Sequence, residues 1–207
     1  TGENDPTPVD INCLLPQTYA ITLKTCAMGQ GMLMGDFNFA ALHAAELVTT
    51  NTFSGPVPTG LTVTFHNSLE DANTDQNPLP NIYNSQTGNI WARIELISNP
   101  TCYSVEVIQL VVNQLPILLL NKTDETCSAS NDGTASVFVT NNQGAYNYDW
   151  SNLAGTNNPA SQTGLNGGIY TVTVTDGNGC TSSGSVTAVS YTHLRAHETV
   201  LDLVCRL

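Results

Sequence analysis

The sequence contains few basic residues. Lys and Arg together number 5 against 17 Asp and Glu, which gives a formal net charge of −12 at pH 7. Two of the five, Arg195 and Arg206, lie near the C-terminal end. Proteins that bind nucleic acid or an anionic lipid surface neutralise phosphates with Lys and Arg. The composition therefore argues against both kinds of partner.

The sequence also lacks long apolar runs and the common catalytic motifs. Its longest apolar run, "LPILLL", is far short of the roughly 20 residues that span a bilayer. There is no C-x-x-C pair, no G-x-S-x-G and no H-E-x-x-H. His66 has Glu70 and Asp71 nearby, but a catalytic set needs convergent geometry that a sequence does not show. We therefore assign no catalytic residue and expect no enzymatic activity.

Alternating polar and apolar residues predict β-strands in the first half of the chain. "GLTVTFH" alternates at Leu61 to Phe65, "NIWARIEL" places Ile90, Ala92 and Ile94 on one face, and "YSVEVIQLVV" alternates after Cys102. A period of two is typical of strands with one buried face. The segment "FNFAALHAAEL" fits a short helix and a strand equally well. We expect Arg93 to pair with Glu95 or Glu106 across strands.

The second half is rich in turn signals. Short strands such as "TASVFVT" and "IYTVTVTD" are separated by "SNDG", "NNQG", "NGG" and "DGNG". Asn and Gly tolerate the positive φ of hairpin turns, so this spacing is typical of an antiparallel sandwich. We predict an all-β chain of two tandem immunoglobulin-like antiparallel β-sandwich domains. The expected divisions are a linker or the end of a preceding module, two domains and a tail, over residues 1–17, 18–116, 117–188 and 189–207.

The cysteines agree with this division. Cys26 and Cys102 bracket the first domain, and Cys127 and Cys180 bracket the second, while Cys13 has no obvious partner. Disulfides often stabilise small secreted domains with limited cores. We therefore expect an oxidising, extracellular setting and the pairs Cys26–Cys102 and Cys127–Cys180. The alternative, that all are buried free thiols, stays open.

Residues 127–180 contain several closely spaced motifs that match a known protein family. The matching elements are Cys127, "DGTA" from Asp132, "YNYDW" ending at Trp150, "GIYTVTVTDGNGC" from Gly168, and Cys180. The region resembles the SprB-type repeat of long secreted proteins of gliding Bacteroidetes, over residues 117–188. The resemblance implies an immunoglobulin-like sandwich. Trp150 would pack against its disulfide, as a core aromatic does in such domains.

The first domain resembles a second module of the same proteins. It shares an early Cys26, "DFNF" at Asp36, "G-x-T-V-T-F" from Gly60, "IWARIE" from Ile90, "CY" at Cys102, and the ending "LVVNQLP". The pattern is similar to immunoglobulin-like adhesin modules that leave the cell by type IX secretion. The resemblance implies a cell-surface location, with neighbouring repeats of the same chain and surface polysaccharide as partners.

Two functions follow from these resemblances. The chain is either a non-catalytic structural or adhesive segment of a large surface protein, used in adhesion or gliding motility, or an accessory carbohydrate-binding or spacer region of a secreted polysaccharide-degrading enzyme. We expect no cofactor and assign no metal ligand. Calcium could bind the oxygen-rich loops that hold Asp71, Asn73 and Asp75, or Asp176 and Asn178. The opening "TGENDPTP", without a Met, predicts a fragment of a longer protein.

The last residues differ from the rest of the chain. "VSYTHLRAHETVLDLVCRL", from Val189, back-translates in one frame to a sequence that resembles a short-read sequencing adapter. We therefore expect residues 189–207 to be a non-native tail with no packed role. Although His193 and His197 have the i, i+4 spacing of a zinc site, neither they nor Cys205 are then candidate ligands. The alternative is an ordinary C-terminal helix.

Overall fold

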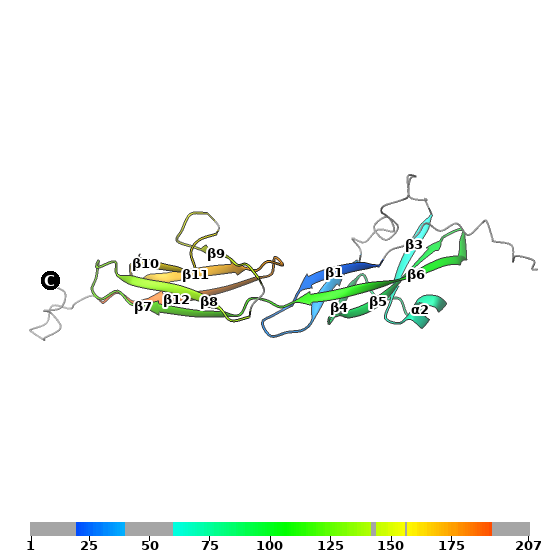
Figure 1. Cartoon of the computed structure of the whole chain (residues 1–207), viewed down its shortest axis with the longest axis horizontal. Coiled ribbons are helices and arrows are strands. Elements are labelled where there is room, and N and C mark those ends of the chain that lie inside the picture. The colour runs from blue at the N-terminus through cyan, green and yellow to red at the C-terminus, as the bar shows by residue number, and fades with distance from the viewer. Residues whose placement is uncertain (1–19, 40–59, 142–143, 156, 192–207) are drawn as a thin grey trace, which may run out of the picture. The chain divides into compact units, whose positions relative to one another are not determined.

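The computed structural model describes residues 20–39, 60–141, 144–155 and 157–191, and the chain divides into two compact units (Figure 1). The first unit holds the described residues up to Val112 except Gly29–Met32. The second holds those four residues and the described residues from Asn113 onward. Within this part of the chain, the only helix is one short turn. The all-β fold expected from the alternation is confirmed for the described residues.

The described part of the first unit contains six strands and one helix. Four strands form one sheet in the order β1-β6-β5-β3, and two form the pair β2-β4. Neighbours β3 and β5, β5 and β6, and β2 and β4 are antiparallel. The elements are β1 (Ile21–Cys26), β2 (Gly35–Asn38), β3 (Leu61–His66), α2 (Leu69–Thr74), β4 (Ile82–Ser85), β5 (Gly88–Leu96) and β6 (Asn99–Asn113).

The inward face of this sheet follows the alternation of the sequence. Ile90, Ala92 and Ile94 of β5 are buried in one cluster with residues of β2, β3 and β6. Phe39 stacks on Phe65 with ring centroids 4.5 Å apart. Phe37 and Asn38 of the ambiguous "FNFAALHAAEL" segment are in strand β2. Residues 40–47 of that segment lie outside the described residues, so the choice between helix and strand there stays a prediction.

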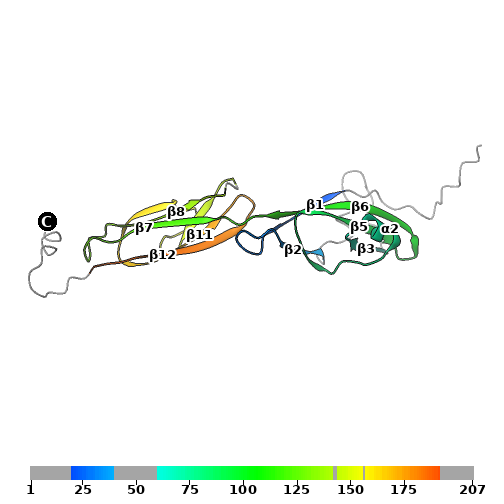
Figure 2. The same ribbon diagram turned by 90° about the horizontal axis from the view of Figure 1, so that it is seen from below.

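Helix α2 covers part of the opposite face of the sheet, against β3 and β5 (Figure 2). Its start is set by Ser68, whose Oγ accepts a hydrogen bond from the Asp71 N–H at 3.0 Å. Its end is set by Asp75 in the left-handed conformation, with φ of 53°. A Ser three residues before an acidic residue is a known helix-start pattern. Its role here was not predicted from the sequence, which suggested a calcium loop.

The second unit consists of two three-stranded sheets. Their orders are β10-β8-β7 and β12-β11-β9, and every pairing within them is antiparallel. Strand β7 also lies beside β12 of the other sheet (Figure 2). The strands are β7 (Leu118–Thr123), β8 (Gly133–Val139), β9 (Asn147–Trp150), β10 (Ser161–Leu165), β11 (Gly168–Thr175) and β12 (Thr181–Ala188).

Trp150 is the largest side chain in the core of the second unit. It is fully buried, and its Nε1–H donates a hydrogen bond of 2.9 Å to the Pro159 carbonyl. Six buried residues form its cluster, and none of these is a cysteine: Ala135, Val137, Trp150, Leu165, Val172 and Val174. Aliphatic side chains and tyrosines pack around this core, and no cysteine is among them.

Backbone pairing continues to Tyr191, three residues past the predicted end of the second domain at residue 188. The Glu125 N–H donates to the Val189 carbonyl at 3.1 Å, and the Ser128 N–H donates to the Tyr191 carbonyl at 3.2 Å. The side chains of Val189 and Tyr191 are 43% and 56% exposed. These bonds use backbone groups that any residue supplies. Residues 192–207, with His193, His197 and Cys205, lie outside the described residues, and their origin stays a prediction.

Candidate functional site

The four cysteines named from the sequence are all disulfide-bonded: Cys26, Cys102, Cys127 and Cys180. Cys102 and Cys180 are each 1% exposed, and Cys127 is 9% exposed. The expectation of disulfides over free thiols therefore holds for these four residues. Cys13 lies outside the described residues.

The predicted pairing is wrong, because Cys26 is bonded to Cys180. Strand β1 lies beside β6, and the Thr22 hydroxyl donates to Gln109 at 3.2 Å. A Cβ on Gly35 would meet Thr25, the Cys26 carbonyl and Val112. Cys26 therefore lies near the C-terminal end of β6.

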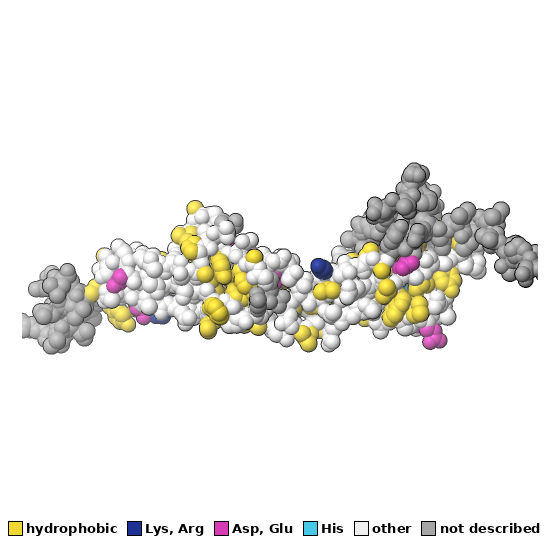
Figure 3. All heavy atoms as spheres, in the orientation of Figure 1, with side chains coloured by type: hydrophobic (Ala, Val, Ile, Leu, Met, Phe, Trp, Pro, Cys, Tyr) yellow, Lys and Arg dark blue, Asp and Glu magenta, His cyan; other side chains and the backbone are white. Residues whose placement is uncertain are grey.

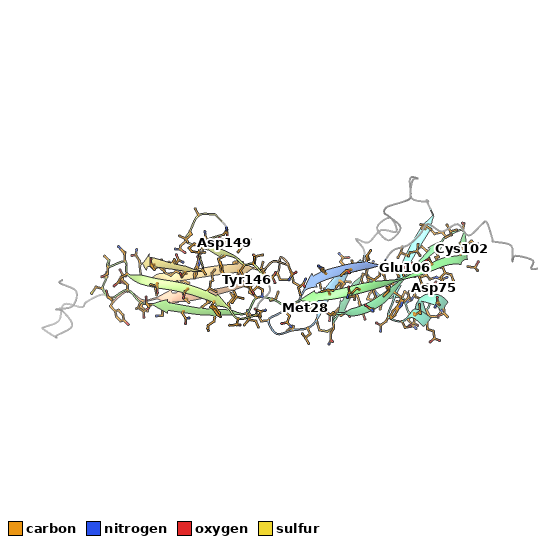
Figure 4. All side chains as sticks on the ribbon, in the orientation of Figure 1. Met28, Asp75, Cys102, Glu106, Tyr146 and Asp149 are labelled. Atoms are coloured by element: carbon orange, nitrogen blue, oxygen red, sulfur yellow. The ribbon has the colours of Figure 1, made fainter. Side chains whose placement is uncertain are left out.

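Cys102 is at the opposite end of the same strand. Figure 4 shows Met28, just past β1, and Cys102 at opposite ends of β6. Ten residues of extended chain between Cys102 and Val112 span about 33 Å. A disulfide requires Cα atoms within about 7 Å. The sequence shows that Cys26 and Cys102 flank the first domain, but it does not show at which ends of the strands they lie.

The pair Cys127–Cys180 fails for a similar reason. Ser128, next to Cys127, bonds Tyr191, which lies beyond the last residue of β12. Cys180 directly precedes the first residue of the same strand. Strand β12 therefore separates the two cysteines by most of the length of the unit.

The Cys26–Cys180 bond closes a long loop. In the chain-entropy account, closing a loop of about 150 residues stabilises the folded state by about 5 kcal/mol, less any strain. This free energy comes from the constraint on the unfolded chain and not from a local contact.

Tryptic mapping without reduction tests the pairing. Cleavage after Lys24, Arg93, Lys122 and Arg195 places Cys26 in peptide 25–93, Cys102 in 94–122, and both Cys127 and Cys180 in 123–195. We expect a covalent species that contains peptides 25–93 and 123–195. Fragmentation should locate that link at Cys26 and Cys180. A direct Cys26–Cys102 link would contradict the assignment.

His66 is buried and fully hydrogen-bonded. It is 0% exposed, its Nδ1 lies 2.7 Å from the Gln76 carbonyl, and its Nε2 lies 2.8 Å from the Thr64 hydroxyl. Because a carbonyl only accepts, the Nδ1–H of His66 donates to Gln76, and Nε2 shares a hydrogen bond with the Thr64 hydroxyl. Asp75 Oδ1 is 3.7 Å from Nε2. A hydroxyl, an imidazole and an acceptor in this order resemble a triad, but the imidazole has no surface open to a substrate. The group instead connects β3 to the segment that follows α2.

Arg93 is also buried and connects three segments. Its Nε donates to Glu95 at 2.7 Å, as predicted for the partner, although Glu95 lies on the same strand and not across from it. Its Nη1 donates to the Ala72 and Asn73 carbonyls, and its Nη2 donates to the Pro100 carbonyl. The guanidinium also lies 3.6 Å from the centroid of the Tyr103 ring. Helix α2 has no basic residue in its last turn, so Arg93 supplies the cation that its terminal carbonyls favour.

Arg93→Met should destabilise the first unit by about 3 kcal/mol, because it leaves Glu95 and three carbonyls without their donor. The matched control is Lys122→Met. Lys122 is hydrogen-bonded to Asp124, and the two side chains are 33% and 28% exposed. Exposed pairs contribute at most about 1 kcal/mol. Urea denaturation of both variants measures how much each substitution lowers the free energy of unfolding. Equal losses would contradict a stabilising role for the buried hydrogen bonds of Arg93.

Both oxygens of Asp71 and one oxygen of Asp176, in the loops proposed for calcium, accept hydrogen bonds from within the chain. The Ser68 hydroxyl and the Asn77 amide donate to the two oxygens of Asp71, at 2.6 Å and 2.8 Å. These bonds, with that of Ser68 the stronger cause, lower the pKa of Asp71. Asp176 Oδ1 accepts from the N–H groups of Asn178 and Cys180 and closes the turn. In the described part of the chain, no three His, Cys, Asp or Glu side chains converge as a metal site.

Glu125 holds together three segments at one end of the second unit. It is 1% exposed and accepts from the Asn131 N–H at 2.9 Å and the Gly167 N–H at 3.2 Å. These bonds and one from the Ser190 hydroxyl lower the pKa of Glu125, with the Asn131 N–H as the strongest cause. The sequence analysis missed this residue because a Glu in the polar stretch "KTDETC" looks solvated. No pattern in the sequence indicates its burial.

A carboxylate with a lowered pKa stabilises the fold only while it is ionised. The contribution of Glu125 is complete above its ordinary pKa of 4.5 and is lost as the pH falls through its lower pKa in the folded chain. Wild type should therefore unfold at a higher temperature than Glu125→Gln at pH 7. The difference should shrink as the pH falls below 4.5, in melts recorded by circular dichroism. A gap that does not change with pH would show that the charge of Glu125 contributes nothing.

Two family matches cover most of the described chain. Residues 23–116 match the Flavobacterium inter-domain disulphide bond domain, and residues 119–155 match the SprB repeat. The second match lies within the region that resembles SprB-type repeats and confirms that resemblance. The name of the first family agrees with the Cys26–Cys180 bond. No curated protein matches the chain.

Solved immunoglobulin structures are similar at low identity. The amphioxus IgVJ-C2 molecule is 12% identical, with 80% of this chain and 98% of that chain covered and a TM-score of 0.30. The N-terminal eight Ig domains of the Down Syndrome Cell Adhesion Molecule, isoform 1.30.30, are 9% identical, with 84% and 23% covered and a TM-score of 0.38. TM-scores this low support no argument about function.

The described residues contain no helix long and apolar enough to cross a membrane. The two matched families are typically structural modules, and together they are those of an adhesin-like region of a Bacteroidetes surface protein. The chain thus joins a region similar to the Flavobacterium inter-domain disulphide bond domain to a region similar to the SprB repeat.

Proposed function

We propose that this chain is a non-catalytic structural and adhesive segment of a large secreted protein at the bacterial surface. The observation that carries the proposal is the succession of the two family matches, over residues 23–116 and 119–155. Repeated modules of this kind extend a surface protein away from the cell. Adhesion and gliding motility are the activities that such a segment would serve, with type IX secretion as its route out of the cell.

The covalent structure supports an extracellular location. Four described cysteines are disulfide-bonded, and disulfides persist in oxidising compartments outside the cytosol. A surface segment must remain folded without the chaperones of the cell. Bonds at both ends of β6 and both ends of β12 limit local unfolding there.

The surface supports a role that avoids non-specific association. Uncharged side chains and backbone, drawn in white, dominate the visible face of each unit, and basic side chains are sparse (Figure 3). A net charge of −12 repels anionic polymers and other copies of the chain. The buried hydrogen bonds of His66 further support a role without catalysis, because they leave no free base for a substrate.

Antibodies against residues 20–191 test the proposal in the bacterium that encodes the chain. They should label intact cells, and brief treatment of those cells with an external protease should remove the label. Deleting the gene should reduce attachment to glass or spreading on agar. Labelling only after the cells are permeabilised would contradict a surface role. A glycan or peptide hydrolase activity of the purified chain that His66→Ala abolishes would contradict the absence of catalysis.

A further inference from the structure

The outward face of the sheet β10-β8-β7 carries two adjacent exposed apolar side chains. Leu118, Leu120 and Val137 pack in the core, so the alternation of the strands turns Leu119 and Phe138 outward. These two residues are directly opposite each other in the pairing of β7 with β8. Leu119 is 52% exposed and Phe138 is 64% exposed. Together with Ile117, which is 37% exposed, they form an apolar strip, here called the Phe138 strip.

Hydroxyl and amide side chains continue this face beyond the strip. Asn121 and Ser161 lie on either side of Ser136 in the register of the three strands, and Thr163 lies opposite Thr134. Asn121, Ser161 and Thr163 are exposed. On this face the described strands carry no Asp, Glu, Lys or Arg, because Lys122 alternates to the other side of β7. This face is therefore uncharged, although the chain has a net charge of −12.

We propose that this face binds a neutral, ribbon-like polysaccharide, such as a β-1,4-linked glucan or mannan. The C–H groups on one side of a sugar ring stack on an aromatic ring, and its equatorial hydroxyls reach outward to hydrogen-bonding side chains. The Phe138 strip supplies the first kind of contact, and the Ser, Thr and Asn side chains of the neighbouring positions supply the second. The strip and the hydroxyl-bearing positions follow one another along the paired strands, as sugar rings follow one another along an extended polymer.

The charge of the chain limits which ligands this face can bind. An acidic polysaccharide would meet no cation on this face and would be repelled by the net charge of the chain. A second copy of the chain would bring the same net negative charge. A neutral polymer needs no cation on this face and is not repelled by the net negative charge of the chain. Binding by one face of exposed side chains should be weak, and repetition of modules along one surface protein would raise the avidity.

This inference rests on the proposed surface role and specifies what the segment adheres to. Its failure is distinguishable from failure of that role, because antibody labelling of intact cells does not depend on glycan binding. A structural segment that binds no polysaccharide would still be labelled. An intracellular protein that binds polysaccharide would not.

Native gel electrophoresis through dissolved polysaccharide tests the inference with the complete chain. The probes are hydroxyethyl cellulose and glucomannan, which are neutral, and alginate, which is acidic. The variants are Phe138→Ser and Leu119→Ser in the strip, with Ile169→Ser as the control. Ile169 is 71% exposed and lies on β11, in the other sheet. Melting temperatures close to wild type confirm that the variants are folded, as expected for exposed positions.

We expect at least one neutral polymer, but not alginate, to retard the wild-type chain. Phe138→Ser should weaken that retardation about fivefold or more, the scale of one lost aromatic stacking contact. Leu119→Ser should weaken it less, and Ile169→Ser should leave it unchanged. Three results would overturn the inference: no retardation by either neutral polymer, equal effects of Phe138→Ser and Ile169→Ser, or a dimer in sedimentation that Phe138→Ser abolishes. The third would assign the face to a second copy of the chain.

Discussion

Each unit of this chain depends on a small apolar core between its strands. The described cores have eight buried residues in the first unit and six in the second. Small domains bury a smaller fraction of their surface than large ones and are correspondingly marginal in stability. The segments at the ends of the strands therefore receive little support from apolar burial. Hydrogen-bonded polar groups and disulfides hold them in place instead.

The buried polar groups show how this is achieved. Arg93 donates to carbonyls of α2 and of the segment at Pro100, and His66 connects β3 to the carbonyl of Gln76. Glu125 does the same for the loops at Asn131 and Gly167 in the second unit. Burying a charge or an imidazole is costly unless it is fully hydrogen-bonded. These side chains meet that condition through backbone groups that a strand or helix end leaves without partners.

The outward faces of the strands differ from the inward faces in composition. Because the inward faces of the strands are already apolar, their outward faces decide what the segment can bind. Most of these positions carry Thr, Ser and Asn, which stay hydrated and attract few partners. The Phe138 strip departs from this pattern, and it does so on a face without charge. That contrast makes it a binding surface of a chain whose remaining surface resists association.

Several features followed from the sequence alone. The alternation at Ile90, Ala92 and Ile94 predicted a strand and its buried face, because side chains of a strand point to opposite sides in turn. The "TASVFVT" and "IYTVTVTD" segments with their Asn-Gly and Asp-Gly turns predicted the second sandwich. The resemblance to SprB-type repeats was likewise visible in linear order, and so was the presence of disulfides in an acidic chain with few lysines.

Other features depended on the tertiary structure. The positions of Cys26 and Cys102 at opposite ends of β6 depend on the order and direction of the strands, which the spacing of cysteines does not encode. The burial of Arg93 depends on α2 covering the outer face of the sheet, whereas its alternation predicted exposure. Glu125 looks like any solvated acid until the loops at Asn131 and Gly167 bring their N–H groups to it. The alternation of buried and exposed residues along a strand is set by the geometry of the backbone. Hydrogen-bond and disulfide partners that are distant in sequence are set by the packing of whole strands, helices and loops.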